Sequence, residues 1–125
     1  MFCHSCGTIL DCLALRFEYQ GKSFVFSGDS SISDELKSLS KNADLLIHWC
    51  YRLSQEKNYT MIIEKYPCAK EIAVLSQLVN VKKLLLTHMK SHMDTELNHL
   101  QMKKEMKENF SGDSGISEDL MIINL

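Results

Sequence analysis

The sequence predicts an α/β protein in which a β-hairpin is followed by three units of helix and then strand. Three short apolar runs (residues 24–26, 45–47 and 84–86) have the length and composition of strands buried in a sheet. The segments between these runs carry helix-capping residues and apolar side chains at helical spacing. Because one helix separates each run from the next, a parallel β-α-β order explains the pattern.

Length and composition favour one ordinary domain. A chain of 125 residues is close to the commonest domain size, so residues 1–125 are expected to form a single domain. No apolar run approaches the roughly 20 residues that cross a bilayer, which predicts no membrane association. The 16 acidic and 14 basic residues nearly balance, and the basic ones are scattered. This argues against a nucleic-acid surface formed by the chain alone.

The cysteines indicate a reducing compartment. Their number, five, is odd, and residues 1–7 lack the basic and apolar regions of a secretory signal, so we expect a cytoplasmic protein. Cys3 and Cys6 have CxxC spacing, but no second CxxC follows to complete a four-thiolate zinc site. Reduced structural thiols are favoured over a zinc ribbon or a redox motif.

The first half of the chain reads as a hairpin and one helix-strand unit. Residues 13–19 and 23–27 have strand patterns, and the turn between them contains a glycine. Ser31 and Ser33 are candidate N-caps of a helix that ends near Asn42. Residues 44–49 then form a buried strand.

The second half contains two more such units. Residues 50–65 are irregular and are expected to form a loop. Pro67 opens a helix over residues 68–79, and residues 83–89 contain the next strand. We expect the last helix to be capped by Asp94 or Thr95, to reach about Asn109, and to be followed by a closing strand over residues 120–125. The apolar face expected for that helix consists of Leu97, Leu100 and Met106.

Two polar residues stand where buried strands end. Asp29 follows the first apolar run and His88 follows the third. Parallel sheets bind ligands at the carboxyl ends of their strands, and a carboxylate with an imidazole suits zinc or a similar ion. Taken alone, Asp29 is better explained as a turn residue that helps the next helix to start. His88 at the end of a second strand favours the metal-ligand hypothesis instead.

The other histidines have different expected roles. His4 precedes the hairpin and is close enough in sequence to reach the strand ends. His48 lies within an apolar strand, where a core histidine bonded to the backbone is a better interpretation than a ligand. His99 is expected to be an exposed helix residue.

Several motifs in a fixed order carry a family resemblance. They are FVFSGD (24–29), SDEL (33–36), ADLLIH (43–48), AKEIA (69–73), VKKLLLTH (81–88) and EDLM (118–121). In this order they resemble the C-terminal half of a metallo-β-lactamase-fold hydrolase, closest to the branch of ribonuclease Z and arylsulfatase-like proteins. The resemblance implies half of an αββα sandwich, and it covers nearly the whole chain.

The resemblance also implies site residues and a reaction. Asp29 would bridge two metal ions, His88 would complete the shell of the second metal, and His4 would bind the first. The cofactor would be a pair of zinc ions, which activates water for hydrolysis of a phosphodiester or related ester. A nucleic-acid partner is expected only because of this resemblance.

The sequence departs from the family pattern at the most important positions. The HxHxDH motif of the N-terminal half is absent, which leaves three candidate ligands for two metals. Trp49 follows His48 where the family usually has glutamate, and Tyr66 stands about where ribonuclease Z-like enzymes have a histidine. The chain therefore has no obvious proton donor for the leaving group. One face of the sheet should also be left uncovered.

Three hypotheses follow. The first is a truncated or split metal-dependent hydrolase with little or no activity alone. The second is a non-catalytic subunit or interaction protein, which completes the fold with a partner carrying the missing half or by forming a homo-oligomer. The third is an inactive remnant of a broken gene, which predicts the same sequence.

Overall fold

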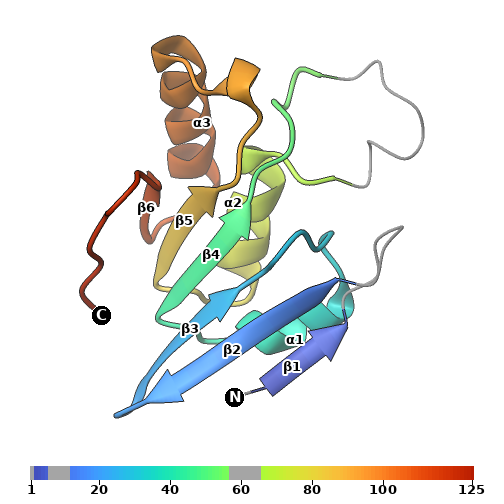
Figure 1. Cartoon of the computed structure of the whole chain (residues 1–125), viewed down its shortest axis with the longest axis vertical. Helices are drawn as coiled ribbons and strands as arrows, with labels where there is room; N and C mark the ends of the chain where they lie inside the picture. Colours follow the sequence, from blue (N-terminus) through green and yellow to red (C-terminus); the bar gives the residue numbers. More distant parts are fainter. Residues whose placement is uncertain (1, 6–11, 57–65) are drawn as a thin grey trace.

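A computed structural model describes residues 2–5, 12–56 and 66–125 of the chain. The described strands form one six-stranded sheet whose spatial order follows the sequence (Figure 1). The strands are β1 (Phe2–Ser5), β2 (Leu13–Tyr19), β3 (Lys22–Phe26), β4 (Leu45–Trp49), β5 (Lys83–Thr87) and β6 (Asp113–Ile116). The helices are α1 (Asp34–Ser40), α2 (Ala69–Leu78) and α3 (Glu96–Asn109), with a 3-10 turn, η2 (Ser91–Met93), before α3.

The strand directions confirm the predicted fold class. β1, β2 and β3 pair antiparallel, whereas β3, β4, β5 and β6 pair parallel. Each parallel step passes through one helix, so the hairpin is followed by three helix-strand units as predicted. The hairpin turns at Gln20 and Gly21, whose φ angles of 49° and 74° are the left-handed values that a tight two-residue turn requires.

Side-chain caps explain where the helices begin. The Ser33 hydroxyl accepts a hydrogen bond from the backbone N–H of Leu36 at 3.2 Å, which starts α1. The Thr95 hydroxyl accepts from the N–H of Asn98 at 3.3 Å, which starts α3. These two predicted caps are confirmed. The loop predicted over residues 50–65 is described only as far as residue 56, and residues 57–65 lie outside the described part of the chain.

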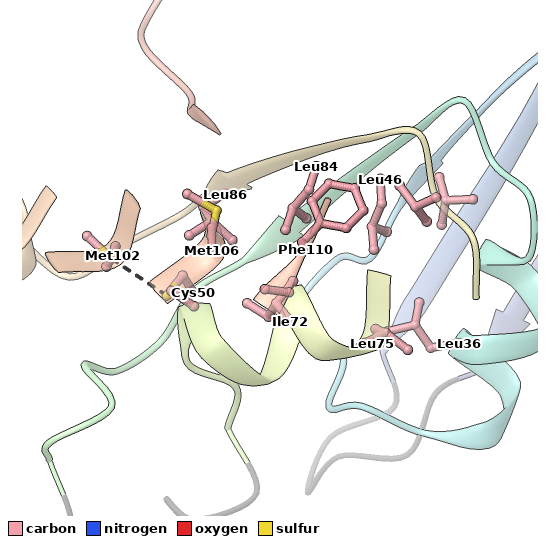
Figure 2. Packing of buried hydrophobic residues seen from close by; sticks show 14 of the residues in the cluster. Leu36, Leu46, Cys50, Ile72, Leu75, Leu84, Leu86, Met102, Met106 and Phe110 are labelled. Atoms are coloured by element: carbon pink, nitrogen blue, oxygen red, sulfur yellow. Dashed lines mark hydrogen bonds between the residues drawn. The ribbon is translucent and has the colours of Figure 1, made fainter. Parts of the chain in front are cut away.

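The core lies between the sheet and the helices (Figure 2). Alternate strand residues such as Val25, Leu46 and Leu86 point to the helix side and are fully buried. The helices meet them with side chains that include Leu36, Ile72, Met102 and Met106, and Phe110, which follows α3, joins the same cluster. Burial of these apolar groups is the main term that stabilises the fold.

The apolar face predicted for α3 is wrong in part. Met106 is fully buried, but Leu97 and Leu100 are 78% and 60% exposed. The buried side chains of α3 are Met102, Glu105 and Met106. Leu97 precedes Met106 by about two and a half helical turns, so the two side chains lie on opposite sides of the helix.

The closing strand predicted over residues 120–125 is also wrong. The last strand is β6, which pairs parallel with β5 and has the low strand propensity of an Asp-Ser-Gly sequence. Leu120 has φ of 62°, which is incompatible with an extended strand, and it is 98% exposed. Backbone pairing with β5 and burial of Ile116 therefore outweigh the apolar composition of the tail.

The second face of the sheet carries no helix of the described chain (Figure 1). Its side chains alternate with those of the core and are Leu15, Phe17, Phe24, Phe26, Leu45, Ile47 and Leu85, of which Leu45 and Leu85 are only 3% and 5% exposed. We call this set the free face. The described helices include none long and apolar enough to cross a membrane.

Candidate functional site

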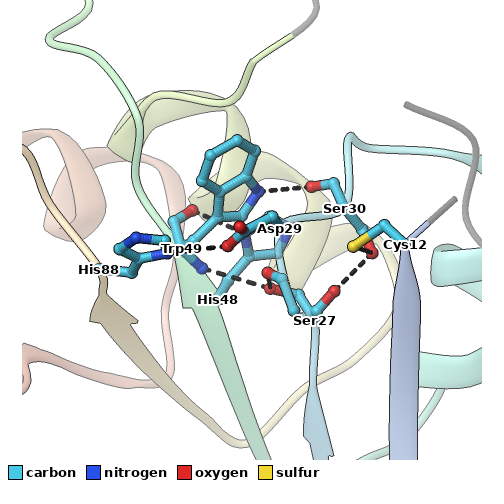
Figure 3. Close-up of polar contacts among 8 residues, drawn as sticks. Cys12, Ser27, Asp29, Ser30, His48, Trp49 and His88 are labelled. Atoms are coloured by element: carbon cyan, nitrogen blue, oxygen red, sulfur yellow. Dashed lines mark hydrogen bonds and ion pairs between the residues drawn. The ribbon is translucent and has the colours of Figure 1, made fainter. Parts of the chain in front are cut away.

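Asp29 and His88, the two strand-end candidates, are in direct contact (Figure 3). The Oδ1 atom of Asp29 lies 2.8 Å from Nδ1 of His88, although the residues are 59 positions apart in the chain. Asp29 follows the end of β3, and His88 follows the end of β5. Because β4 lies between these strands, the pair spans the carboxyl end of β4. Both side chains are more than half exposed.

A glycine turns the chain from β3 toward Asp29. Gly28 has φ of 54°, and a Cβ atom built there would lie 2.5 Å from the carbonyl oxygen of Leu13. Any other residue would therefore meet both an unfavourable backbone conformation and a clash with β2. His88 itself has φ of 50°, which turns the chain away from the direction of β5. Both site residues are thus positioned by left-handed turns at strand ends.

Trp49 fixes the loop that carries Asp29. Its indole N–H donates to the carbonyl oxygen of Ser30 at 2.6 Å, and its backbone N–H donates to the hydroxyl of Ser27 at 3.2 Å. The Ser30 hydroxyl in turn donates to the carbonyl oxygen of Ser27. Residues on both sides of Asp29 are therefore held to the end of β4.

His48 is a core residue, as predicted. It is fully buried, and its Nδ1 atom lies 2.8 Å from the carbonyl oxygen of Trp49. Since a carbonyl oxygen only accepts, Nδ1 carries the proton. Burial lowers the pKa of His48 to about 4, so the ring is neutral at physiological pH. Its Nε2 atom has no hydrogen-bond partner among the described residues.

Two of the three described cysteines are buried, which is consistent with the structural role predicted for them. Cys12, Cys50 and Cys68 are free thiols. Burial raises the pKa of Cys50 to about 12 and also raises that of Cys68, so neither is a ready thiolate. The side chains of Cys3 and Cys6 lie outside what the structure describes.

An aromatic cluster lies beside His88, and the sequence patterns did not reveal it. The ring centres of Trp49 and Tyr66 are 5.3 Å apart, and Tyr51 lies 5.2 Å from the first and 4.5 Å from the second. The Trp49 ring is also 6.1 Å from that of His88, and Lys90 Nζ lies 3.7 Å from the centre of the Tyr51 ring. The only available signal was the spacing of two between Trp49 and Tyr51.

Asp29 and His88 fit part of a metal shell. A carboxylate oxygen and an imidazole nitrogen are zinc ligands, and in the structure they are joined by a hydrogen bond of 2.8 Å. The contact uses Nδ1 of His88 and leaves Nε2 unused by Asp29. In residues 12–56 and 66–125, however, no group of three or more histidine, cysteine, aspartate or glutamate side chains could hold a metal ion.

His4 is the third predicted ligand, and its side chain lies outside what the structure describes. Its backbone is placed on β1, where it pairs with Ala14 of β2. β1 is antiparallel to β2, as β3 is, so the carboxyl ends of β1 and β3 share one edge of the sheet. The backbone position of His4 is compatible with the predicted role, which remains a prediction.

The chain is similar in sequence to ribonuclease Z proteins. It is 30% identical over 118 residues to ribonuclease Z of Archaeoglobus fulgidus, which covers 94% of this chain and 37% of that protein. It is 28% identical over 106 residues to ribonuclease Z of Bacillus subtilis, which covers 85% of this chain and 34% of that protein. The chain thus spans about a third of the length of these relatives. No protein-family model matches it.

Solved structures agree on the fold. The metallo-β-lactamase fold protein YhfI from Bacillus subtilis superimposes with a TM-score of 0.77 and 27% identity, over 93% of this chain and 45% of that one. The short form of human tRNase Z gives a TM-score of 0.71 over 98% of this chain and 41% of that one. Its 18% identity supports the fold alone. The sheet and helices described above are therefore part of a metallo-β-lactamase fold.

Proposed function

We propose that this chain, a relative of ribonuclease Z with part of the metallo-β-lactamase fold, is a truncated or split metal-dependent hydrolase that is inactive alone. The contact between Asp29 and His88 carries the proposal, because it brings two ligand types together at the edge where such sheets bind ligands. The substrate class suggested by the relatives is a phosphodiester of RNA.

The roles of the two residues follow from their atoms. If zinc is bound, the Asp29 carboxylate and Nδ1 of His88 would hold it in place of the hydrogen bond between them, and zinc there would activate water or polarise a phosphoryl oxygen. Without zinc, Asp29 orients the His88 ring through the hydrogen bond at Nδ1. Both side chains are exposed, so a ligand or a further protein segment can reach them.

Two features support inactivity of the chain alone. Asp29 and His88 supply two ligands, whereas zinc in proteins is usually four-coordinate. Trp49 stands where the resemblance expects a glutamate, and its indole N–H is occupied by Ser30 and cannot transfer a proton. Among the described side chains there is thus neither a complete metal shell nor an acid for the leaving group.

Zinc retention tests the metal role. The purified chain is stripped with a chelator, equilibrated with zinc and dialysed, and its metal content is measured for the wild type, D29A and H88A. We expect weak, substoichiometric binding that both substitutions abolish. D119A and H99A, which alter an acidic residue and a histidine elsewhere, are matched controls and should bind as the wild type does. Equal zinc content in all five proteins would refute the role of Asp29 and His88.

A second candidate function is that of an interaction subunit without catalysis. The free face favours it, because an apolar sheet face without helices resembles the inner face of a two-sheet sandwich. A partner that supplies the missing half would cover this face. Co-expression with the part of Bacillus subtilis ribonuclease Z that this chain does not match tests the idea, with co-purification as the expected result. Separate elution of the two polypeptides would count against it.

A further inference from the structure

Two segments at the carboxyl edge of the sheet are joined by ionisable side chains. One is the turn over residues 53–56, which follows β4, and the other is η2, which follows β5. The Oε1 atom of Glu56 lies 2.7 Å from Nε2 of His92, although 36 positions separate the two residues. Neither residue belongs to the pair of Asp29 and His88. The contact is therefore a separate feature that the proposed hydrolase role does not use.

Glu56 closes the turn with both its backbone and its side chain. Its N–H donates to the carbonyl oxygen of Leu53 at 3.1 Å, and its Oε2 atom accepts from the N–H of Leu53 at 2.8 Å. Burial raises the pKa of Glu56, but the bond from Leu53 and the nearby His92 and Lys90 lower it more, so the pKa lies below its ordinary value. Glu56 is therefore an anion at neutral pH, with one oxygen on the turn and the other on η2.

The backbone of His92 is fixed on the other side of the contact. Its carbonyl oxygen accepts from the side-chain amide of Asn98 at 3.0 Å, and the adjacent Met93 is fully buried. The side chain of His92 is 50% exposed, whereas that of Glu56 is 19% exposed. Water and salt therefore screen this contact less than they screen a pair of fully exposed charges.

The start of the turn is held in a different way from its end. Leu53 is 7% exposed, and the Ser54 hydroxyl donates to the carboxylate of Glu105 on α3. The end of the turn is held through Glu56 and His92. Loss of this contact would therefore loosen the end of the turn and leave Leu53 in the core.

The other histidines of this region pair elsewhere. His88 contacts Asp29 at 2.8 Å, and His99 contacts Asp94 at 2.9 Å within the start of α3. Carboxylates, lysines and arginines ordinarily keep their charge between about pH 5.5 and 8, whereas histidine changes its charge there. His92 is therefore the residue through which pH acts on the turn. The further charged residues on the segments around it are Arg52 and Glu105 beside the turn, Lys90 before η2 and Glu96 after it.

We propose that the contact between His92 and Glu56 is a pH-sensitive latch that fastens the end of the turn at residues 53–56 to η2. A protonated imidazole donates from both nitrogens, and its bond to a carboxylate is roughly twice as strong as a bond between neutral groups. The latch is therefore closed in mild acid and is looser above about pH 7, where an ordinary histidine is neutral. It depends on no bound metal and goes beyond the proposed hydrolase role.

Amide hydrogen exchange followed by NMR tests the latch. The N–H of Leu53 donates to Glu56, so its protection factor, corrected for the intrinsic rate at each pH, reports whether the Glu56 side chain is in place. In the wild type we expect this protection to fall by about twofold to fivefold between about pH 5.5 and 8. H92A should give a low value at both pH values. H92R, whose guanidinium stays charged, should give the higher value at both.

H99Q is the matched control. It removes another histidine that is paired with a carboxylate, but the pair of His99 and Asp94 lies within the start of α3 and does not join α3 to the turn. H99Q should therefore keep the wild-type change in protection. Constant protection of Leu53 in the wild type, or a pH-dependent change that persists in H92A, would overturn the proposal. A change that H99Q abolishes would also overturn it, because the start of α3 would then be the sensor.

A double-mutant cycle at the same two pH values separates His92 from every other titrating group. Urea unfolding of the wild type, E56Q, H92A and the double variant gives the coupling between the two side chains, and the contribution of His48 cancels in the cycle. The coupling factor in the unfolding equilibrium constant should fall by about twofold to fivefold from about pH 5.5 to 8. A coupling factor that is equal at both pH values would overturn the latch even if the protection of Leu53 changed.

Discussion

The indole ring of Trp49 contacts the phenol ring of Tyr66, with ring centres 5.3 Å apart. At these two positions the family resemblance leads us to expect a glutamate and a histidine instead. The two departures are therefore neighbours in space, although 17 positions separate them in the sequence. The aromatic contact lies beside His88, whose ring centre is 6.1 Å from that of Trp49. This arrangement stabilises the strand ends but provides no general acid.

Replacing Trp49 by Phe should loosen the loop that carries Asp29. The substitution keeps an aromatic ring but removes the indole N–H that donates to Ser30, leaving a buried carbonyl oxygen without this partner. We expect the free energy of unfolding to fall by about 1–3 kcal/mol, as for other lost buried hydrogen bonds. Urea unfolding measures the loss, and zinc titration should show weaker binding than in the wild type. Tyr19→Phe is the control, because Tyr19 is 77% exposed, and it should change neither quantity.

Gly28→Ala should destabilise the protein more than a glycine substitution within a strand. The added Cβ would lie 2.5 Å from the Leu13 carbonyl oxygen, at a residue with φ of 54°. A loss of about 1–3 kcal/mol is expected from strain of this kind. Gly115→Ala is the matched control, since nothing lies within 4 Å of a Cβ built there. Thermal unfolding of both variants measures the two losses of stability, and equal melting temperatures would contradict the prediction that Gly28→Ala is the more destabilised variant.

The elements were predictable where local chemistry decides them. Ser33 and Thr95 cap helices because their hydroxyls accept from backbone N–H groups three residues later, a pattern visible in the sequence. Asp29 and His88 each follow the end of a strand, and the carboxyl ends of parallel strands share one edge of the sheet. The sequence therefore also predicted that these two residues lie at the same edge. Local signals were therefore sufficient for the fold class and for this pair.

Features that depend on tertiary contacts could not be predicted from the sequence. Leu97 is apolar but exposed, because α3 packs on α2 and β6 through its other side. β6 forms from a sequence of low strand propensity because β5 offers it a backbone partner. The cluster of Trp49, Tyr51 and Tyr66 joins residues from two separate segments, so no local pattern marks it. Each of these features depends on which surfaces meet after folding.

Asp44 should matter more for stability than its partner Lys82. The Asp44 carboxylate is mostly buried, accepts from the backbone N–H of Ser23 at 2.8 Å and pairs with Lys82 Nζ at 2.7 Å. Asp44→Ala leaves the buried N–H of Ser23 without this acceptor, and we expect a loss of about 1–3 kcal/mol. Lys82 is 70% exposed, so Lys82→Ala should cost under about 1 kcal/mol. Equal losses in urea unfolding of the two variants would contradict this ranking.

His48 should make the protein less stable in mild acid. Burial lowers its pKa from 6.5 to about 4, so the unfolded chain takes up a proton at a higher pH than the folded protein does. The stabilisation is therefore complete above pH 6.5 and is lost as the pH falls toward 4, by about 3 kcal/mol at most. The Lys82 and Ser23 contacts lower the pKa of Asp44 to about 2, so its contribution is lost only between about pH 4 and 2.

The measurement that separates these groups is urea unfolding at a series of pH values. His48→Asn removes the titrating ring, so it should be less stable at pH 7 but should have a flatter pH dependence between 6.5 and 4. Tyr19→Phe is the control, because Tyr19 is 77% exposed, and it should keep the wild-type slope. If His48→Asn retained that slope, another group would be responsible for the acid sensitivity. A pH slope lost in His48→Asn but kept in the control would show that protonation of the buried His48 ring destabilises the folded protein.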